Sequence, residues 1–96
     1  MLIVAAYDVD TTTLDGAKRL RKVAKACEKW GVRVQNSVFE LRIDQAQYVT
    51  LCHTLEGIID LERDSIRFYR LGNHYEGKIT SIGKPLRIEQ DQPMIL

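Results

Sequence analysis

Two aspartates, Asp8 and Asp10, directly follow the longest apolar stretch of the chain, Met1–Tyr7. Carboxylates commonly hold Mg²⁺, and a bound Mg²⁺ can activate water and neutralise charge on phosphate oxygens during phosphodiester hydrolysis. Asp8 stands where a buried strand would end, and strand alternation can aim Asp10 to the same side. A single aspartate is a poor metal site, and Asp10 is explained equally well as a residue that caps a loop. Both are candidates, and Asp8 is the stronger one.

A second set of candidate residues is basic and belongs to one predicted helix. Between residues 15 and 30 the apolar side chains recur at helical spacing, and four lysines fall in a narrow stripe on the opposite face. The candidate nucleic-acid-binding residues are Lys18, Arg19, Arg21, Lys22, Lys25, Lys29 and, on the strand that follows, Arg33. Such a face can neutralise phosphates without reading bases, which suits double-stranded DNA of any sequence. The alternative is an ordinary solvated helix face.

The charge of the whole chain conceals an uneven distribution. Fourteen Lys and Arg residues against thirteen Asp and Glu residues give a net charge of +1, which excludes a globally basic DNA-coating protein. Residues 16–42 nevertheless hold eight basic and two acidic residues, whereas residues 44–64 hold five acidic residues and one arginine. This asymmetry favours a polyanion as the partner of the basic region.

The other reactive side chains form no recognisable site. Cys27 and Cys52 lack the CxxC spacing of a metal site, so we interpret them as small core residues in a reducing compartment. His53 lies off the apolar stripe of its helix and His74 lies in a turn, so neither is a persuasive general base. The sequence also predicts no exposed aromatic platform for stacking bases, because four aromatic residues occupy core-like positions: Tyr7, Trp30, Phe39 and Phe68.

The order of predicted elements indicates the fold that positions these residues. A chain of 96 residues, 45% of them hydrophobic, suits one domain with a thin core, for which oligomerisation is expected. The patterns predict helices over 15–30 and 44–59 and strands over 2–7, 32–35, 38–43, 66–71 and 78–82. The fold class is therefore α+β: a ferredoxin-like βαββαβ domain over residues 1–83 with an additional C-terminal strand. Residues 84–96 form an apolar tail that we expect to dock at a dimer interface.

The location of the protein follows from its apolar segments. The longest of them is far shorter than the roughly 20 residues that cross a bilayer. Asp8 and Asp10 also stand where a signal peptide would continue. We therefore predict a cytoplasmic protein without a membrane partner.

Two short motifs give the sequence a family resemblance. Tyr7-Asp8 closes the first predicted strand, and Gln35-x-Ser37-Val38-Phe39-Glu40 follows the basic helix at the expected separation. With Ile82-Gly83 and the strand over 66–71 also in place, the chain from residue 1 to about residue 83 resembles CRISPR-associated protein two, a small adaptation protein.

The resemblance implies both an assembly and an activity. It implies a homodimer that bridges the dimers of the CRISPR integrase and holds the new spacer DNA. It also implies a Mg²⁺-dependent endonuclease acting on DNA or on single-stranded RNA, in which Asp8 of each protomer is the catalytic residue and the shared metal ligand. Since ferredoxin-like domains host many unrelated functions, a non-catalytic regulatory or interaction module is the alternative.

Overall fold

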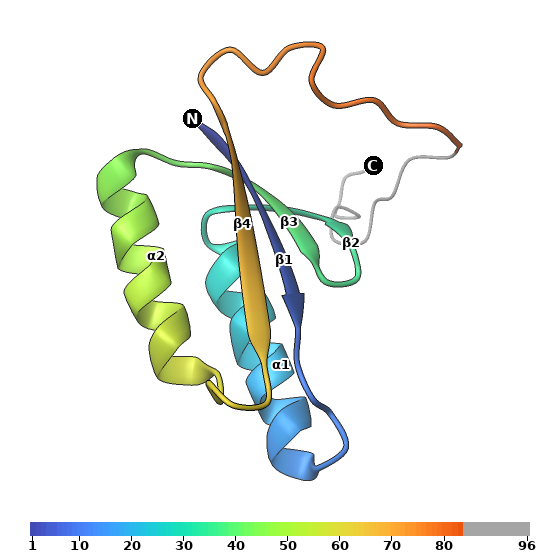
Figure 1. Ribbon diagram of the computed structural model, residues 1–96, viewed down its shortest axis with the longest axis vertical. Coiled ribbons are helices and arrows are strands. Elements are labelled where there is room, and N and C mark those ends of the chain that lie inside the picture. The colour runs from blue at the N-terminus through green and yellow to red at the C-terminus, as the bar shows by residue number, and fades with distance from the viewer. Residues whose placement is uncertain (84–96) are drawn as a thin grey trace, which may run out of the picture.

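Strand β1 (Leu2–Asp8) is the central element of the sheet. It pairs antiparallel with β3 (Val38–Arg42) on one side and with β4 (Ser65–Gly72) on the other. Strand β2 (Gly31–Gln35) pairs antiparallel with β3, so the strand order is β2-β3-β1-β4. The computed structural model describes residues 1–83, within which β2 and β4 form the two edges of the sheet (Figure 1).

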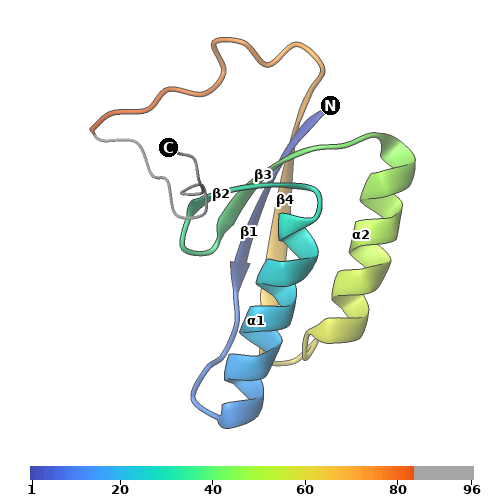
Figure 2. The ribbon, with the colours of Figure 1, turned by 180° about the vertical axis from the view of Figure 1, so that it is seen from behind.

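Helices α1 (Leu14–Glu28) and α2 (Gln45–Ile58) cover the same face of the sheet (Figure 2). The βαββαβ order confirms the predicted α+β, ferredoxin-like fold. Asp44 followed three residues later by Gln47 is a sequence pattern typical of a capping box, and the box forms: the Gln47 N–H donates to the Asp44 carboxylate at 2.8 Å, and the Asp44 N–H donates to the Gln47 side chain at 2.9 Å. Neither helix of the described residues is long and apolar enough to span a membrane.

The hydrophobic core lies between the sheet and the two helices. Alternation along β1 and β3 turns every second side chain toward the helices, and the apolar stripes of α1 and α2 meet them there. The largest fully buried side chains of this layer are Ile3, Val23, Cys27, Phe39, Leu41 and Leu51. Cys27 is thus the core residue that the sequence predicted, whereas Cys52 is only half-buried.

Gly31 marks the point where α1 gives way to β2. Glycine after a run of helical spacing is a common helix stop, and α1 ends shortly before Gly31, at Glu28. The structure adds a second reason for glycine at this position. A Cβ atom on Gly31 would collide with the backbone carbonyl of Glu40 on β3, so only glycine allows the two strands to approach closely here.

The predicted fifth strand over residues 78–82 is wrong for the described chain. Residues 79–82 lack strand pairing, and the segment runs from β4 away over the end of the sheet (Figure 1). Ile79 and Ile82 are 41% and 95% exposed. A strand requires a hydrogen-bonded neighbour, and residues 1–83 of this chain provide none for this segment. The predicted tail over 84–96 lies outside the described residues.

Candidate functional site

Asp8 is the last residue of the central strand and is exposed. Tyr7 belongs to the core on the helix side, so strand alternation places Asp8 on the opposite, open face of the sheet, next to Ser65 of β4. Within residues 1–83 no three His, Cys, Asp or Glu side chains lie close enough to hold a metal ion together. Asp8 of one protomer could therefore supply only one carboxylate to a metal.

Asp10 is engaged in the loop that follows Asp8. Its Oδ1 accepts hydrogen bonds from the backbone N–H of Thr12 at 3.0 Å and from the Thr12 hydroxyl at 2.7 Å. These bonds, the backbone one most of all, lower the pKa of the Asp10 carboxyl. This geometry favours the interpretation of Asp10 as a loop-capping residue.

The outer face of α1 is basic, as the sequence predicted. In Figure 2 this helix lies in front of the sheet. The four exposed lysines, which we call the lysine stripe, are Lys18, Lys22, Lys25 and Lys29. Arg21 is exposed beside them, and the acidic residues of α1 are Asp15 and Glu28 at its two ends. A polyanion would meet a face with little internal compensation of its charge.

The two other predicted nucleic-acid-binding arginines have partners within the protein. The Arg19 side chain is only 16% exposed and forms an ion pair of 2.7 Å with the fully buried carboxylate of Asp64. Arg33 lies over the ring of Phe39, 5.4 Å from its centroid, and 3.8 Å from Glu28. The structure therefore separates Arg19 and Arg33 from the lysine stripe.

Asp64 is the residue of this region that sequence reasoning missed. Its Oδ1 accepts from the backbone N–H of Asp10 at 3.0 Å, and its Oδ2 accepts from Arg19 Nε at 2.7 Å and from the backbone N–H of Asp60 at 2.8 Å. In the sequence, Asp64 counted only as one acid among five. Its partners lie up to 54 residues away, so no local spacing could have revealed it.

Removal of the Asp64 charge is expected to destabilise the fold in a pH-dependent way. The hydrogen bond from Arg19 is the main reason that the pKa of Asp64 falls from 3.8 to about 2. A depressed carboxyl pKa stabilises the fold above the unfolded value and loses this effect as the pH falls through the folded value. Asp64→Asn should therefore be less stable at neutral pH, by about 3 kcal/mol for a broken buried pair. Urea unfolding from pH 7 down to pH 2 should show the two stabilities converging below about pH 4; a constant difference would contradict this assignment.

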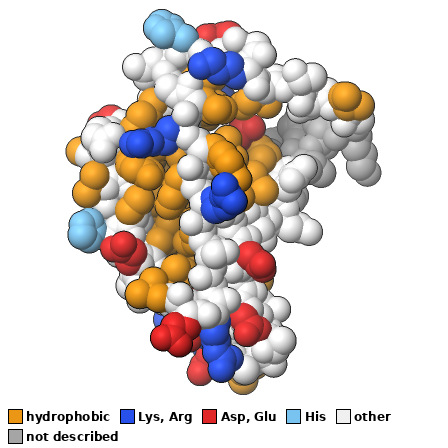
Figure 3. Space-filling model, in the orientation of Figure 1, with side chains coloured by type: hydrophobic (Ala, Val, Ile, Leu, Met, Phe, Trp, Pro, Cys, Tyr) orange, Lys and Arg blue, Asp and Glu red, His pale blue; other side chains and the backbone are white. Residues whose placement is uncertain are grey.

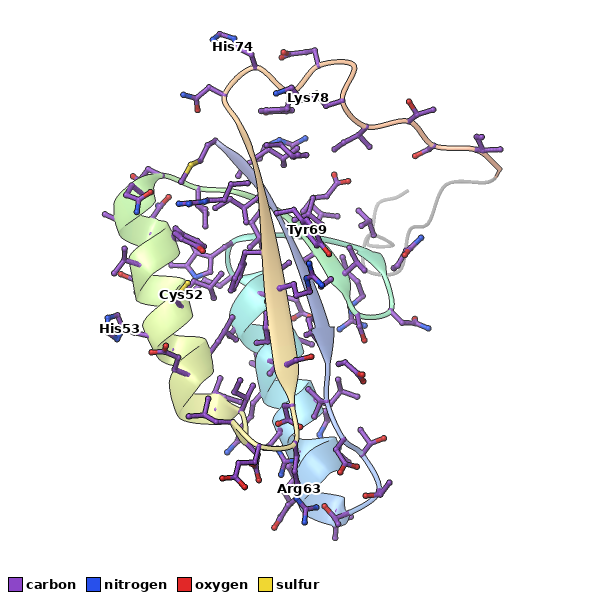
Figure 4. All side chains as sticks on the ribbon, in the orientation of Figure 1. Cys52, His53, Arg63, Tyr69, His74 and Lys78 are labelled. Carbon is purple, nitrogen blue, oxygen red and sulfur yellow. The ribbon has the colours of Figure 1, made fainter. Side chains whose placement is uncertain are left out.

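The remaining candidate side chains are a buried cysteine, two exposed histidines and an exposed tyrosine. Burial raises the pKa of the Cys27 thiol to about 11, so it stays protonated at neutral pH. His53 and His74 are exposed and lie far apart in Figure 4. The prediction of no exposed aromatic platform considered four other aromatic residues and left out Tyr69, which is 47% exposed on β4 with Arg67 placed 5.4 Å from its ring centroid.

Comparison with known proteins bears directly on this arrangement. The family described as CRISPR associated protein Cas2 matches residues 1–79. The CRISPR-associated endonuclease Cas2 of Halalkalibacterium halodurans is 50% identical over 95 residues, which cover 99% of each chain. The CRISPR-associated endoribonuclease Cas2 3 of Rhodospirillum rubrum is 44% identical over 95 residues, covering 99% of this chain and 100% of that one.

A solved structure agrees with these sequence matches. The crystal structure of Streptococcus pyogenes Cas2 at pH 6.5 has a TM-score of 0.78 and 48% sequence identity to this protein. It matches 86% of this chain and 100% of that chain. With the family match over residues 1–79 and half of all aligned residues shared with a curated relative, the chain belongs to the CRISPR-associated protein Cas2 family.

Proposed function

We propose that this protein is a DNA-binding subunit of the CRISPR adaptation machinery that acts in the cytoplasm. The observation that carries the proposal is the basic outer face of α1, where the lysine stripe and Arg21 are exposed together. Lysines bind phosphate as point charges and read no bases, so the face suits double-stranded protospacer DNA of any sequence. In this role the protein holds the DNA while it bridges subunits of the CRISPR integrase.

The active form that we propose is a homodimer built on the open face of the sheet. Figure 3 views this face and has a run of hydrophobic side chains beside β4, with a few Lys and Arg side chains among them. Val32 and Tyr69 of the two edge strands are 42% and 47% exposed. Stacking two such faces would bury apolar surface that the thin core of one chain cannot cover.

Truncation after Asn73 should abolish this dimer. We expect the C-terminal residues to pair with the sheet of the second protomer. Among residues 1–83, β4 is an edge of the sheet and residues 78–82 have no strand partner. Size-exclusion chromatography with light scattering, applied to the full chain and to residues 1–73, measures the effect. A stable dimer of residues 1–73 would contradict the exchange of C-terminal segments.

A second candidate function is Mg²⁺-dependent phosphodiester cleavage of DNA or RNA at Asp8. Its support is the exposed carboxylate at the end of the central strand on the same open face. A dimer formed through this face can bring two Asp8 side chains together, and carboxylate oxygens suit Mg²⁺. The bound ion would supply activated water and charge neutralisation at phosphate. Relatives named endonuclease and endoribonuclease add weight to this proposal.

The adaptation role is tested by purification from cells in which the whole system is present. Tagged protein should recover a larger integrase together with double-stranded DNA of protospacer length. A variant with the lysine stripe reversed should recover the integrase with much less DNA. Recovery of neither integrase nor DNA with the wild-type protein would contradict the proposal.

A further inference from the structure

Asp64 joins four segments of the chain at the end of the sheet that carries Asp8. Its side chain is fully buried, and among residues 1–83 Asp64 is the one charged residue that is buried. The two carboxylate oxygens accept four hydrogen bonds, from the backbone of Asp10 and Asp60 and twice from the Arg19 guanidinium. The loop after β1, helix α1, the turn after α2 and the start of β4 therefore meet at one carboxylate.

The Asp64 carboxylate and its four hydrogen bonds, which we call the hub, lie directly beside Asp8 along the chain and across the sheet. Ser65, the neighbour of Asp64, is the register partner of Asp8. The Asp10 N–H, which Asp64 binds, belongs to the second residue after Asp8. Asp64 thus fixes both strands at the place where the Asp8 side chain leaves the sheet.

Further contacts hold the same loop against α1 and against the turn before β4. The Arg19 Nη2 group also reaches the carbonyl oxygen of Asp10 at 3.4 Å. Gly16, in the first turn of α1, lies so close to this carbonyl that a Cβ atom would collide with it. Arg63, labelled in Figure 4 beside this loop, lies 3.8 Å from the Asp10 carboxylate. The loop is therefore held from several sides at Asp10, two residues after Asp8.

We propose that Asp64 and Arg19 are positioning residues for Asp8: by binding the Asp10 peptide unit they fix the direction in which the chain and its carboxylate leave β1. The inference rests on the metal-binding role proposed above for Asp8. It also takes Arg19 out of the DNA-binding set, because its guanidinium is bound within the protein and only 16% exposed. Arg19 acts through the loop and not on phosphate.

The test uses a double variant that keeps the packing but removes the hub. Arg19→Met with Asp64→Leu replaces a buried ion pair by apolar side chains of similar size, a change that is often neutral or stabilising. The backbone N–H groups of Asp10 and Asp60 then both lose their acceptor. The matched control is Lys18→Met, one position before Arg19 on the exposed stripe.

Three measurements on the full-length proteins separate the roles. Amide hydrogen exchange over residues 9–13 should be about tenfold faster in the double variant, because the buried acceptor that protects the loop is gone. Mn²⁺ affinity, measured by electron paramagnetic resonance, should fall by about 10- to 100-fold, as for other groups that orient a metal ligand. The slope of log K against log salt for duplex DNA should stay unchanged, whereas Lys18→Met should lower it by about 0.9 and leave exchange and Mn²⁺ binding intact.

The outcomes distinguish this inference from the proposal on which it rests. A folded double variant with wild-type exchange and Mn²⁺ affinity would overturn it, and so would a loss of salt slope equal to that of Lys18→Met. If the wild-type protein shows no Mn²⁺ binding that Asp8→Asn removes, the metal role of Asp8 is wrong, and exchange over residues 9–13 alone decides whether Asp64 holds the loop. If the double variant does not fold, Arg19→Lys, which keeps a positive charge beside Asp64 but cannot bind both Asp64 and the Asp10 carbonyl as the guanidinium does, is carried through the same measurements.

Discussion

Reversal of the whole lysine stripe to glutamate is expected to abolish the binding of double-stranded DNA. Each lysine that meets a phosphate releases counterions, so the four contacts of the stripe correspond to roughly a hundredfold loss of affinity between about 50 and 200 mM salt. Four glutamates on the same face would repel the phosphates instead of neutralising them. The fold should tolerate the change, because each pair of lysines four residues apart becomes a pair of glutamates, and the repulsion within the pair stays similar.

Fluorescence anisotropy with duplexes of unrelated sequence, titrated over a range of salt concentrations, measures this effect. A control that places four glutamates at exposed positions of α2, namely Gln45, Thr50, His53 and Thr54, adds negative charge elsewhere on the protein. This control should weaken binding far less than the reversed stripe, with the dimer intact in both proteins. Wild-type affinity after reversal of the stripe would locate the DNA-binding surface on another face.

The second large effect is expected from Asp8→Asn. The amide preserves the size of the side chain but removes the negative charge, so a site built from two Asp8 carboxylates loses both of its charged ligands. The Mg²⁺-dependent cleavage proposed above should fall by at least about a hundredfold, because a bound ion would supply several kcal/mol of transition-state stabilisation. DNA affinity should remain close to wild type, since the lysine stripe lies on α1, on the other side of the sheet. Dimerisation should persist as well, because the amide keeps the size of the side chain on the open face.

Spacer acquisition in cells by Asp8→Asn then separates cleavage from scaffolding. Normal acquisition would show that cleavage is dispensable for adaptation. Loss of acquisition with DNA binding and integrase recovery intact would assign a catalytic role to Asp8. The matched control is Asp10→Asn, because the Asp10 carboxylate is occupied by Thr12 within its own loop. Loss of cleavage in Asp10→Asn alone would contradict the assignment of Asp8 as the metal ligand.

Features with a local physical cause could be predicted from the sequence. The capping box of Asp44 and Gln47 forms within four residues, and the alternation of Phe39 and Leu41 with polar neighbours defines the inner face of β3. The exposed lysines likewise follow from helical spacing alone. These elements, and with them the fold class, therefore agree with the structure.

Features that depend on distant contacts could not be predicted in the same way. Arg19 shares the sequence pattern of the lysines beside it, yet its guanidinium is bound by a carboxylate 45 residues later. Residues 78–82 have the composition of a strand, but a strand forms only beside a partner. In both cases the missing information is which distant segment lies beside the residue or strand in the folded protein. Residue spacing does not contain that information.

The position of β4 at the edge of the sheet formed by residues 1–83 also affects how the protein behaves when it is dilute. Residues 1–83 leave one edge of this eight-residue strand without a neighbour, and such an edge, here carrying Ile66 and Phe68, is a template for adding strands from other chains. Arg67 and Arg70 on the same strand oppose the addition of a second copy of β4 by charge repulsion. At concentrations below the dissociation constant of the dimer, the protein should therefore aggregate slowly instead of persisting as monomer. The useful lifetime of a preparation should increase with its protein concentration.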